Sequence, residues 1–502
     1  MLEYLPNLDA AAGDTLQAKL FNDLRQGILS GRLAPHDRLP SSRHLAAHLA
    51  ISRNTVLAVY EQLMAEGYLE SQGPKGTYVS SAVPVARPRA PGPVSAPPRP
   101  RDPPGSANPR SRGVPPPGVE PFKLWYGAYA PAHFPAVAWH TAVREALLKC
   151  RGDYSRDPDP LGDGALRAAI AQRVLVARGL VADPGNIVIT SGFQASLGLL
   201  LTCLSPQPLR VAVENPCYAP ALRVLRERGD AVVRIAVDRW GLQVAELKRH
   251  ALDVVIVTPS HQFPTGATLP MERRAALLAW AKGTGARVIE DDFDSDFRYD
   301  RRPLTALAGL DGTKGTVIYC GTFSKTLGPG LRLAYCVLPP ALQPRDPLGC
   351  AAVDPLPGLE QRALAHLLTS GAYARHVRRL RRHHKEVRDI LVNACQTLFG
   401  AESVFGHEGG MHFCLDPRAT GHGPEGFAAA AADAGIELSP LVQASCSFEP
   451  RGDATSAALA RALIVGFGGL TVDVAPTVAA RLAEVFAAPG FESTPLHKGM
   501  AP

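Results

Sequence analysis

The stretch 319-YCGTFSKTLGPGLRLAY-335 places Lys325 just past a strand-like apolar run, among small hydroxyl residues and glycines. A lysine in such a setting suits a Schiff base with a carbonyl cofactor. Thr322 and Ser324 offer hydroxyl groups to a phosphate, and Arg332 offers a guanidinium to the same group. A Ser-Lys dipeptide alone has no such meaning, so the interpretation depends on the segments around it.

Strand-like apolar runs alternate with helix-length segments on both sides of Lys325. This order predicts an α/β fold with a mostly parallel sheet and with ligand chemistry at the carboxyl ends of its strands. The runs are 187-IVIT-190, 210-RVAVE-214, 253-DVVIVTP-259, 287-RVIED-291, 317-VIYCGTF-323 and 333-LAYCVL-338.

One strand end carries a candidate phosphate cradle. In 190-TSGFQASLGLL-200 the strand passes through a Ser-Gly pair into a helix. The first N–H groups of a helix have no partner within it and attract anions. We therefore expect Gly192, Phe193 and Gln194 to hold a phosphate.

A second strand end carries acidic residues, in 289-IEDDFDSDFRY-299. Asp291 falls at the end of the strand, where its carboxylate can pair with a pyridinium nitrogen and make a cofactor an electron sink. Asp294 and Asp296 are expected to be solvated carboxylates of the following loop.

The first 80 residues have a different pattern. Apolar residues at Leu16, Leu20, Leu24 and Ile28 predict a helix that ends at Gly31. Two short helices are expected over 41–49 and 52–67, with Val56, Val59, Tyr60 and Leu63 facing inward in the second, and 68-YLESQGPKGTYVS-80 has the alternation of a two-stranded wing.

The second short helix has the side chains that reading of the DNA major groove requires. Ser52 can cap it, and Arg53, Asn54 and Thr55 lie on its first turn, where side chains reach base edges. The other candidate contacts, to backbone phosphates or to the minor groove, are Ser41, Ser42 and Arg43 at the preceding helix start and Lys75 and Gly76 at the wing tip.

A proline-rich stretch with interspersed arginines separates the two patterns and predicts an extended linker. Its arginines can contact DNA phosphates, although a solvated spacer is the favoured interpretation. The expected division is a mostly α-helical DNA-binding domain at 12–80, the linker at 81–119, a large α/β domain at 120–487 and a loose tail at 488–502.

Composition excludes several classes of protein. The nine cysteines are scattered without a CxxC pair, so neither a metal site nor a disulfide framework is predicted. No signal peptide is apparent and the longest apolar runs are too short to span a bilayer, so we expect a cytoplasmic protein without a membrane partner. The net charge of +7 permits nucleic-acid binding without requiring it.

The basic segment 375-RHVRRLRRHHKEVRDIL-391 has two interpretations. It can form a second DNA-contacting surface. The favoured alternative is a solvated helix that turns Val377, Leu380 and Val387 inward.

Several motifs together resemble known families. RLPSSRHLA, ISRNTV, YEQLMAEGYL and GPKGTYV resemble the winged helix-turn-helix of the GntR family, and the 319–335 stretch resembles the internal-aldimine motif of fold-type I pyridoxal-phosphate enzymes. With 258-TPSHQFPTG-266 between its elements, the whole chain is similar to the MocR-type GntR regulators, which fuse a winged helix to an aminotransferase-like domain.

The resemblance implies a set of partners and roles. It implies pyridoxal 5′-phosphate (PLP) bound to Lys325, with Tyr218 stacked on the pyridine ring. It also implies a head-to-tail homodimer that binds repeated sites in double-stranded operator DNA.

Four positions depart from the pattern of an aminotransferase. Phe263 stands where the family's NPTG motif has Asn, and Phe293 stands where related regulators have Tyr. Ile464 takes the place of the arginine that grips a substrate carboxylate, with Arg461 nearby but out of step, and Pro220 stands where γ-aminobutyrate sensors have Arg.

The favoured hypothesis is thus a transcriptional regulator that senses PLP or an amine-type effector. An active aminotransferase with an accessory DNA-binding domain is the alternative, which Phe263 and Ile464 disfavour. A purely dimerising scaffold is disfavoured because it has no need for Lys325, Asp291 and Arg332.

Overall fold

The computed structural model describes residues 16–73, 76–81, 121–149, 157–299, 304–311, 315–342, 356–418, 423–442 and 446–487. The chain forms two compact units, Met1–Ser106 and Ala107–Pro502, which are described separately. The predicted linker beyond residue 81, the predicted tail at 488–502 and the candidate Lys75 lie outside the described residues.

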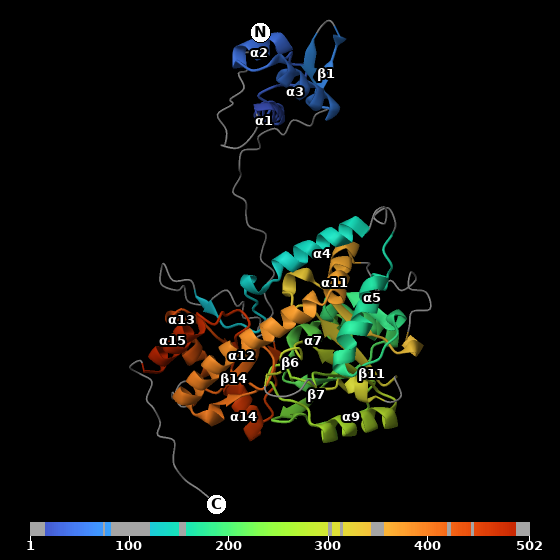
Figure 1. Ribbon diagram of the computed structural model, residues 1–502, viewed down its shortest axis with the longest axis vertical. Coiled ribbons are helices and arrows are strands. Elements are labelled where there is room, and N and C mark those ends of the chain that lie inside the picture. The colour runs from blue at the N-terminus through green and yellow to red at the C-terminus, as the bar shows by residue number, and fades with distance from the viewer. Residues whose placement is uncertain are drawn as a thin grey trace, which may run out of the picture. The chain divides into compact units, whose positions relative to one another are not determined.

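The first unit is a winged helix-turn-helix, as predicted. Helices α1 (Leu16–Leu29), α2 (Ser42–Leu49) and α3 (Arg53–Ala65) precede an antiparallel pair, β1 (Leu69–Ser71) and β2 (Thr77–Val79) (Figure 1). The predicted inner residues of α3 are buried, and so are Leu20, Leu24 and Ile28 of α1. Leu16 is 54% exposed, so its place in the predicted stripe was wrong, because it begins the helix beyond the packed core.

Local capping explains where α2 and α3 begin. The Ser41 hydroxyl accepts from the backbone N–H of His44, and the Ser52 hydroxyl accepts from that of Thr55. The Tyr60 hydroxyl donates to the carbonyl of Pro40 at 2.9 Å, which ties α3 to the segment before α2.

The second unit is built on an eight-stranded mixed sheet. Most of its strands run in one direction, as predicted, whereas β12 and β8 run antiparallel to their neighbours. In spatial order the strands are β4 (Ile187–Thr190), β12 (Ala334–Val337), β11 (Val317–Thr322), β10 (Arg287–Asp292), β9 (Val254–Val257), β5 (Arg210–Asn215), β7 (Ala231–Asp238) and β8 (Gly241–Leu242). All six predicted runs form strands, and β7 and β8 were not predicted.

Helices cover both faces of this sheet because its strands are apolar on both sides. Helices α6 (Phe193–Leu204) and α7 (Ala219–Arg228) pack on the face that carries Val188 and Ile318. The opposite face, with Ile189 and Val317, is covered by α4 (Ala136–Lys149), α5 (Gly164–Ala169), α9 (Met271–Thr284) and α11 (Gly358–Thr369). Several short elements complete this part: α8 (Val244–Leu247), α10 (Leu307–Leu310) and the antiparallel pair of β6 (Cys217–Tyr218) with β17 (Cys446–Ser447).

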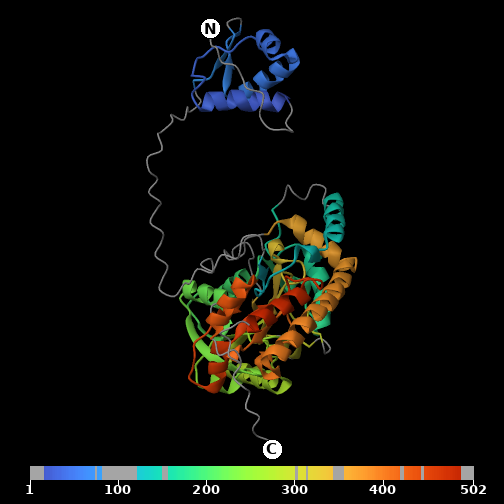
Figure 2. The same ribbon diagram turned by 90° about the vertical axis from the view of Figure 1, so that its left-hand side faces the viewer.

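A smaller antiparallel sheet forms the C-terminal part of the second unit. Its order is β13 (Val404–Phe405), β14 (His412–Leu415), β18 (Leu463–Gly466) and β16 (Ser439–Pro440). It packs with α12 (Ala372–Phe399), α13 (Pro424–Asp433) and α15 (Ala475–Ala487), and α15 lies alongside α12 (Figure 1 and Figure 2). Beside it lie α14 (Ala454–Arg461) and the parallel pair β3 (Phe122–Lys123) and β15 (Ile436–Glu437).

Helix α12 contains the basic segment. Val377, Leu380 and Val387 are buried, as predicted, while Arg378 and Arg382 are exposed. Among the described helices, none combines the length and apolar character needed to cross a bilayer.

Candidate functional site

The predicted cofactor residues meet at one edge of the large sheet. Thr190, Ala334 and Thr322 are register partners across β4, β12 and β11. The loop after β4, the loop after β11 and the segment before β12 therefore emerge side by side. The carboxyl end of β10 joins them, because Asp291 is the partner of Cys320 on β11. Such an edge is where open α/β sheets bind ligands.

Gly192 and Arg332, two of the residues predicted to hold a phosphate, lie against each other and form a candidate cradle. Gly192 caps the N-terminus of α6 with φ of 126°, a conformation that L side chains avoid. A Cβ atom at this position would lie 2.8 Å from Nη2 of Arg332, so the guanidinium lies directly against the glycine. An anion here meets both the free N–H groups of α6, at Phe193 and Gln194, and a fixed positive charge.

Neighbouring hydroxyl groups complete the rim of the cradle. The Thr322 hydroxyl lies 2.9 Å from that of Ser324 and accepts from the backbone N–H of Ser324 at 3.1 Å. The Tyr218 hydroxyl bonds to Gln194 and interacts with the charge of Arg332. The structure thus brings together the candidate phosphate-binding residues that the sequence predicted from the two separate segments 190–200 and 319–335.

Lys325 lies past the end of β11, and its amine faces an aromatic ring. Its Nζ atom lies 4.1 Å from the centre of the Tyr126 ring, and a Cβ on Gly127 would approach it to 2.9 Å. Burial lowers the pKa of Lys325 to about 8, against the opposing charges of Asp294 and Asp291. A lowered pKa leaves more of the amine neutral, which is the nucleophilic form.

Asp291 is buried at the end of β10, as predicted. Burial raises its pKa well above the usual range, the nearby Asp292 and Asp294 raise it further, and Lys325 opposes them. A buried carboxyl in such surroundings gains from a cation placed against it, which is what a protonated ring nitrogen supplies.

The prediction that Asp294 is a solvated carboxylate was wrong. It is 3% exposed, and its Oδ2 atom lies 2.9 Å from Nδ1 of His261. The loop after β10 folds inward here, against His261 and His412. Asp296 is more exposed but is held by Arg178 at 3.3 Å.

Phe263 and Phe293, which stand where the resemblance implies Asn and Tyr, pack against each other and against Tyr126. Both are buried, and Phe263 lies 4.2 Å from Tyr126 and 5.8 Å from Tyr218, centroid to centroid. Phe293 packs 6.0 Å from both Phe263 and Tyr126. Aromatic packing here takes the place of the Asn amide expected from the enzyme motif and of the Tyr phenol expected from related regulators, so neither position supplies a hydrogen-bond donor.

The substrate-carboxylate position is also apolar. Ile464 lies on β18 between Cys414 and Ser439 and is 1% exposed. Arg461 bonds instead to Asp416 at 3.1 Å, so it does not substitute for the missing arginine.

The DNA-reading candidates cluster at the start of α3. Arg53 and Asn54 are exposed, as is Arg43 on α2, and Nε of Arg53 lies 3.5 Å from the hydroxyl of Ser42. At the wing, a Cβ on Gly76 would lie 3.0 Å from Nε of Arg38. Arg38 is thus an exposed cation beside the wing. Sequence reasoning missed it because Arg38 precedes α2 in the chain and lies beside the wing only through an antiparallel β-bridge to Tyr78.

Sequence reasoning also missed Tyr126, His261 and His412 around Lys325. Tyr126 and His412 belong to no quoted motif, and His261 lies within 258-TPSHQFPTG-266 but was given no role there. Each comes from a different part of the chain. The segment after β9 brings His261 into the site, where it contacts Asp294 of the loop after β10, and β14 brings His412.

The two units define a class of protein: a winged DNA-binding head joined in one chain to an aminotransferase-like α/β domain. Residues 16–79 match the bacterial regulatory proteins of the gntR family, and residues 123–463 match the aminotransferase class I and II family. The chain belongs to the MocR-type GntR family of transcriptional regulators.

Similar proteins include two regulators and one aminotransferase of known structure. An uncharacterized HTH-type transcriptional regulator, YhdI of Bacillus subtilis, is 32% identical over 94% of this chain and 95% of its own. The probable rhizopine catabolism regulatory protein MocR of Rhizobium meliloti is 34% identical over 78% of this chain and 79% of its own. The crystal structure of a multiple substrate aminotransferase from Thermococcus profundus superposes with a TM-score of 0.62 at 22% identity, over 73% of this chain and 91% of its own, which shows a shared fold.

Proposed function

We propose that this transcriptional regulator holds PLP at Lys325 and responds to PLP or to an amine that reacts with it. The observation that carries the proposal is the meeting of Lys325, Asp291 and the Gly192–Arg332 cradle at one sheet edge. A phosphate, a ring nitrogen and an aldehyde carbon are the three features of PLP that these groups complement.

Each residue has a distinct role in this proposal. Arg332 and the N-terminus of α6 bind the phosphate, Asp291 holds the ring nitrogen in its protonated form, and Tyr218 covers one face of the ring. Lys325 supplies the amine for covalent attachment. Bound PLP supplies an electron sink and a reactive carbonyl.

The proposal is tested by the visible absorbance of protein purified with PLP. The wild type is expected to show a visible band that survives gel filtration. Lys325→Ala should lose the band, and Lys248→Ala, which replaces an exposed lysine, should retain it. A wild type without any band, at saturating PLP, would exclude the cofactor.

Ligand specificity follows from the apolar Ile464, which stands where the family has an arginine that binds the substrate carboxylate. Because Ile464 is buried and Arg461 is held by Asp416, an amino-acid carboxylate lacks a bidentate partner there. We therefore expect PLP itself, or an amine without that carboxylate, to change operator affinity more than γ-aminobutyrate does. Fluorescence anisotropy of labelled operator DNA measures this directly.

An active aminotransferase remains the second candidate. It requires turnover of an amino donor, and the replacement of two polar positions by Phe263 and Ile464 disfavours it. Steady-state conversion of any amino acid by the wild type, lost in Lys325→Ala, would favour the enzyme over the sensor.

The proposed assembly is a head-to-tail homodimer in the cytoplasm bound to double-stranded operator DNA. Helix α4 supports self-association, because Val137, Leu147 and Leu148 expose apolar side chains on it. Sedimentation of the wild type and of Leu148→Glu tests the dimer. Among the described residues no cysteine forms a disulfide, as suits a reducing compartment.

A further inference from the structure

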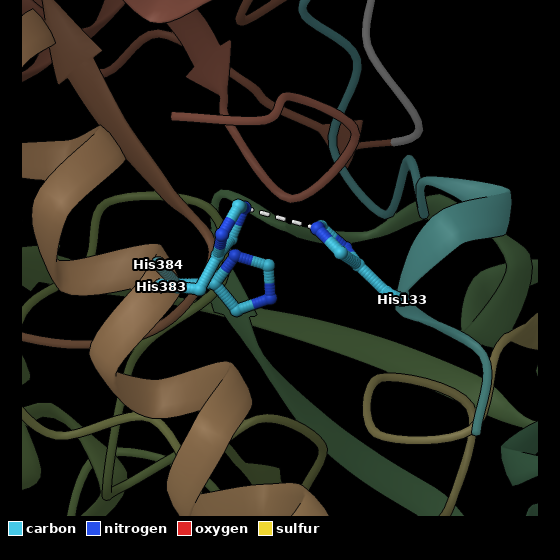
Figure 3. A group of neighbouring side chains, drawn as sticks. All are labelled: His133, His383 and His384. Atoms are coloured by element: carbon cyan, nitrogen blue, oxygen red, sulfur yellow. Dashed lines mark hydrogen bonds between the residues drawn. The ribbon is translucent and has the colours of Figure 1, made fainter. Parts of the chain in front are cut away.

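Three histidines from distant segments meet away from the Lys325 amine. His133 ends a short 3-10 helix, Pro131–His133, and His383 and His384 are neighbours on α12 (Figure 3). Their ring centroids are 4.5, 5.1 and 5.5 Å apart. Figure 3 shows the ring of His133 directed toward the two rings on α12.

The cluster contains buried ring nitrogens that the protein leaves unpaired. His384 is fully buried, and neither of its ring nitrogens has a hydrogen-bond partner. The Nδ1 atom of His133, which is 7% exposed, is also unpaired. A buried polar atom without a partner costs free energy, so these ring nitrogens gain from a group that accepts their lone pairs, such as a metal ion.

His383 is shared between two neighbours. Its Nε2 atom lies 3.0 Å from Nε2 of His133 and 3.0 Å from the carbonyl oxygen of Leu470. One ring nitrogen carries at most one proton, and the Leu470 carbonyl can only accept. In the ion-free protein, Nε2 of His383 therefore carries a proton that lies between the Leu470 carbonyl and Nε2 of His133. An ion bound at Nε2 of His383 would shift this proton to Nδ1 of the same ring and release the Leu470 carbonyl.

The surroundings keep the imidazoles of His133 and His384 neutral, which is the form that binds metals. Burial lowers the pKa of His133 to about 4 and that of His384 to about 3, and the neighbouring histidines add to both effects. The titratable groups that interact with the cluster are His376 and Arg379 on α12 and the carboxylate of Asp473. The Arg379 guanidinium lies 3.3 Å from Nδ1 of His376, which holds it to one side.

We propose that His133, His383 and His384 form a three-histidine site for a divalent ion of the zinc class, with a fourth position open to water. Tetrahedral zinc with metal–nitrogen distances of about 2.0–2.1 Å places ligand nitrogens roughly 3.3 Å apart. The 3.0 Å between His133 and His383 is close to this value. One nitrogen of each ring lies within 4.8 Å of the others. Small ring rotations that move these nitrogens by about 1.5 Å would bring all three to the spacing that zinc requires.

The position of the site gives it a consequence for the Lys325 segment. The hydroxyl of Tyr129 and Nε2 of His376 both bond to the carbonyl of Thr326, at 3.1 and 2.6 Å. Tyr129 precedes His133 in the chain, and His376 lies on α12. An ion that joins His133 to α12 would therefore fix the two segments that hold Thr326, the residue after Lys325.

Cobalt titration tests the site. Tag-free full-length protein, stripped of metal with a chelator, is titrated with Co²⁺ and then with Zn²⁺. We expect one Co²⁺ per chain, with the visible absorption of a four-coordinate ion, and its displacement by Zn²⁺. His383→Gln and His384→Phe should each weaken binding by more than about tenfold, and His140→Ala, an exposed histidine of α4, should bind as the wild type does.

If His384→Phe fails to fold, His383→Gln still tests the proposal, because His383 is only half-buried and its replacement disturbs the core less. Absence of Co²⁺ binding, or binding unchanged in His383→Gln, would overturn the proposal. A His261→Asn variant addresses the other candidate group, His261, Asp294 and His412. If that variant alone abolishes binding, the ion belongs beside Lys325 and the assignment to the three histidines is wrong.

Discussion

The Nζ atom of Lys325 lies 4.1 Å from the centre of the Tyr126 ring. The same ring contacts Phe263, so the amine faces an aromatic cluster in which an aminotransferase has an amide. This setting removes water from the amine, and burial lowers its pKa despite the nearby Asp294 and Asp291.

The lowered pKa predicts a pH-dependent stability for the cofactor-free protein. Lys325 titrates at about 8 in the folded protein instead of 10.5, so between these values the unfolded chain binds more protons. The free energy of unfolding of wild type, relative to Lys325→Met, should therefore rise with pH by at most about 3 kcal/mol from pH 8 to 10.5. Urea unfolding at several pH values measures it, and a constant difference would contradict the lowered pKa.

Replacing Phe263 by asparagine should destabilise the protein despite matching the enzyme motif. Phe263 is 2% exposed and packs on Tyr126 and Phe293, so Phe263→Asn removes aromatic contacts and buries an amide. We expect a loss of roughly 2–4 kcal/mol in the free energy of unfolding. Phe263→Leu, which remains apolar, should cost less. Equal losses would indicate that only ring volume matters.

Gly192→Ala should disrupt the phosphate cradle. The added Cβ would lie 2.8 Å from Nη2 of Arg332 at a φ of 126°. Displacement of the guanidinium should weaken PLP binding about tenfold or more, measured by equilibrium dialysis. Gly198→Ala is the matched control. Gly198 lies in α6, the helix that Gly192 caps, and its added Cβ would meet only Val224 of α7, at 4.0 Å. Weakening of equal size in both variants would place the phosphate elsewhere.

Arg53→Ala should lower the affinity for operator DNA. Arg53 is exposed on the first turn of α3, where a side chain can reach a base edge. The expected cost is about 1–3 kcal/mol with relaxed preference at one base pair, measured by anisotropy on duplexes recovered by selection from random DNA. Arg378→Ala on α12 should bind normally. A comparable loss there would instead favour a second DNA surface on α12.

Locally encoded features were predictable from the sequence. The caps at Ser41 and Ser52 and the glycine turn at position 192 depend on residues within a few positions of each other. The strand runs were found because buried parallel strands are continuously apolar. Strands β7 and β8 were missed because β7 is only partly apolar and β8 has two residues.

Long-range contacts were not predictable, even where the residue was noticed. The burial of Asp294 depends on His261, and the role of Arg461 is decided by Asp416. His133 meets His383 across 250 positions of sequence.

The sequence by itself determined the winged helix, the α/β alternation and the candidates for the cofactor site, since each is recorded in local pattern. Tertiary structure decided which side chains lie beside the Lys325 amine and which histidines gather under the segment that follows it. The physical reason is that caps, turns and apolar periodicity act between neighbours in sequence, whereas burial and charge act between neighbours in space.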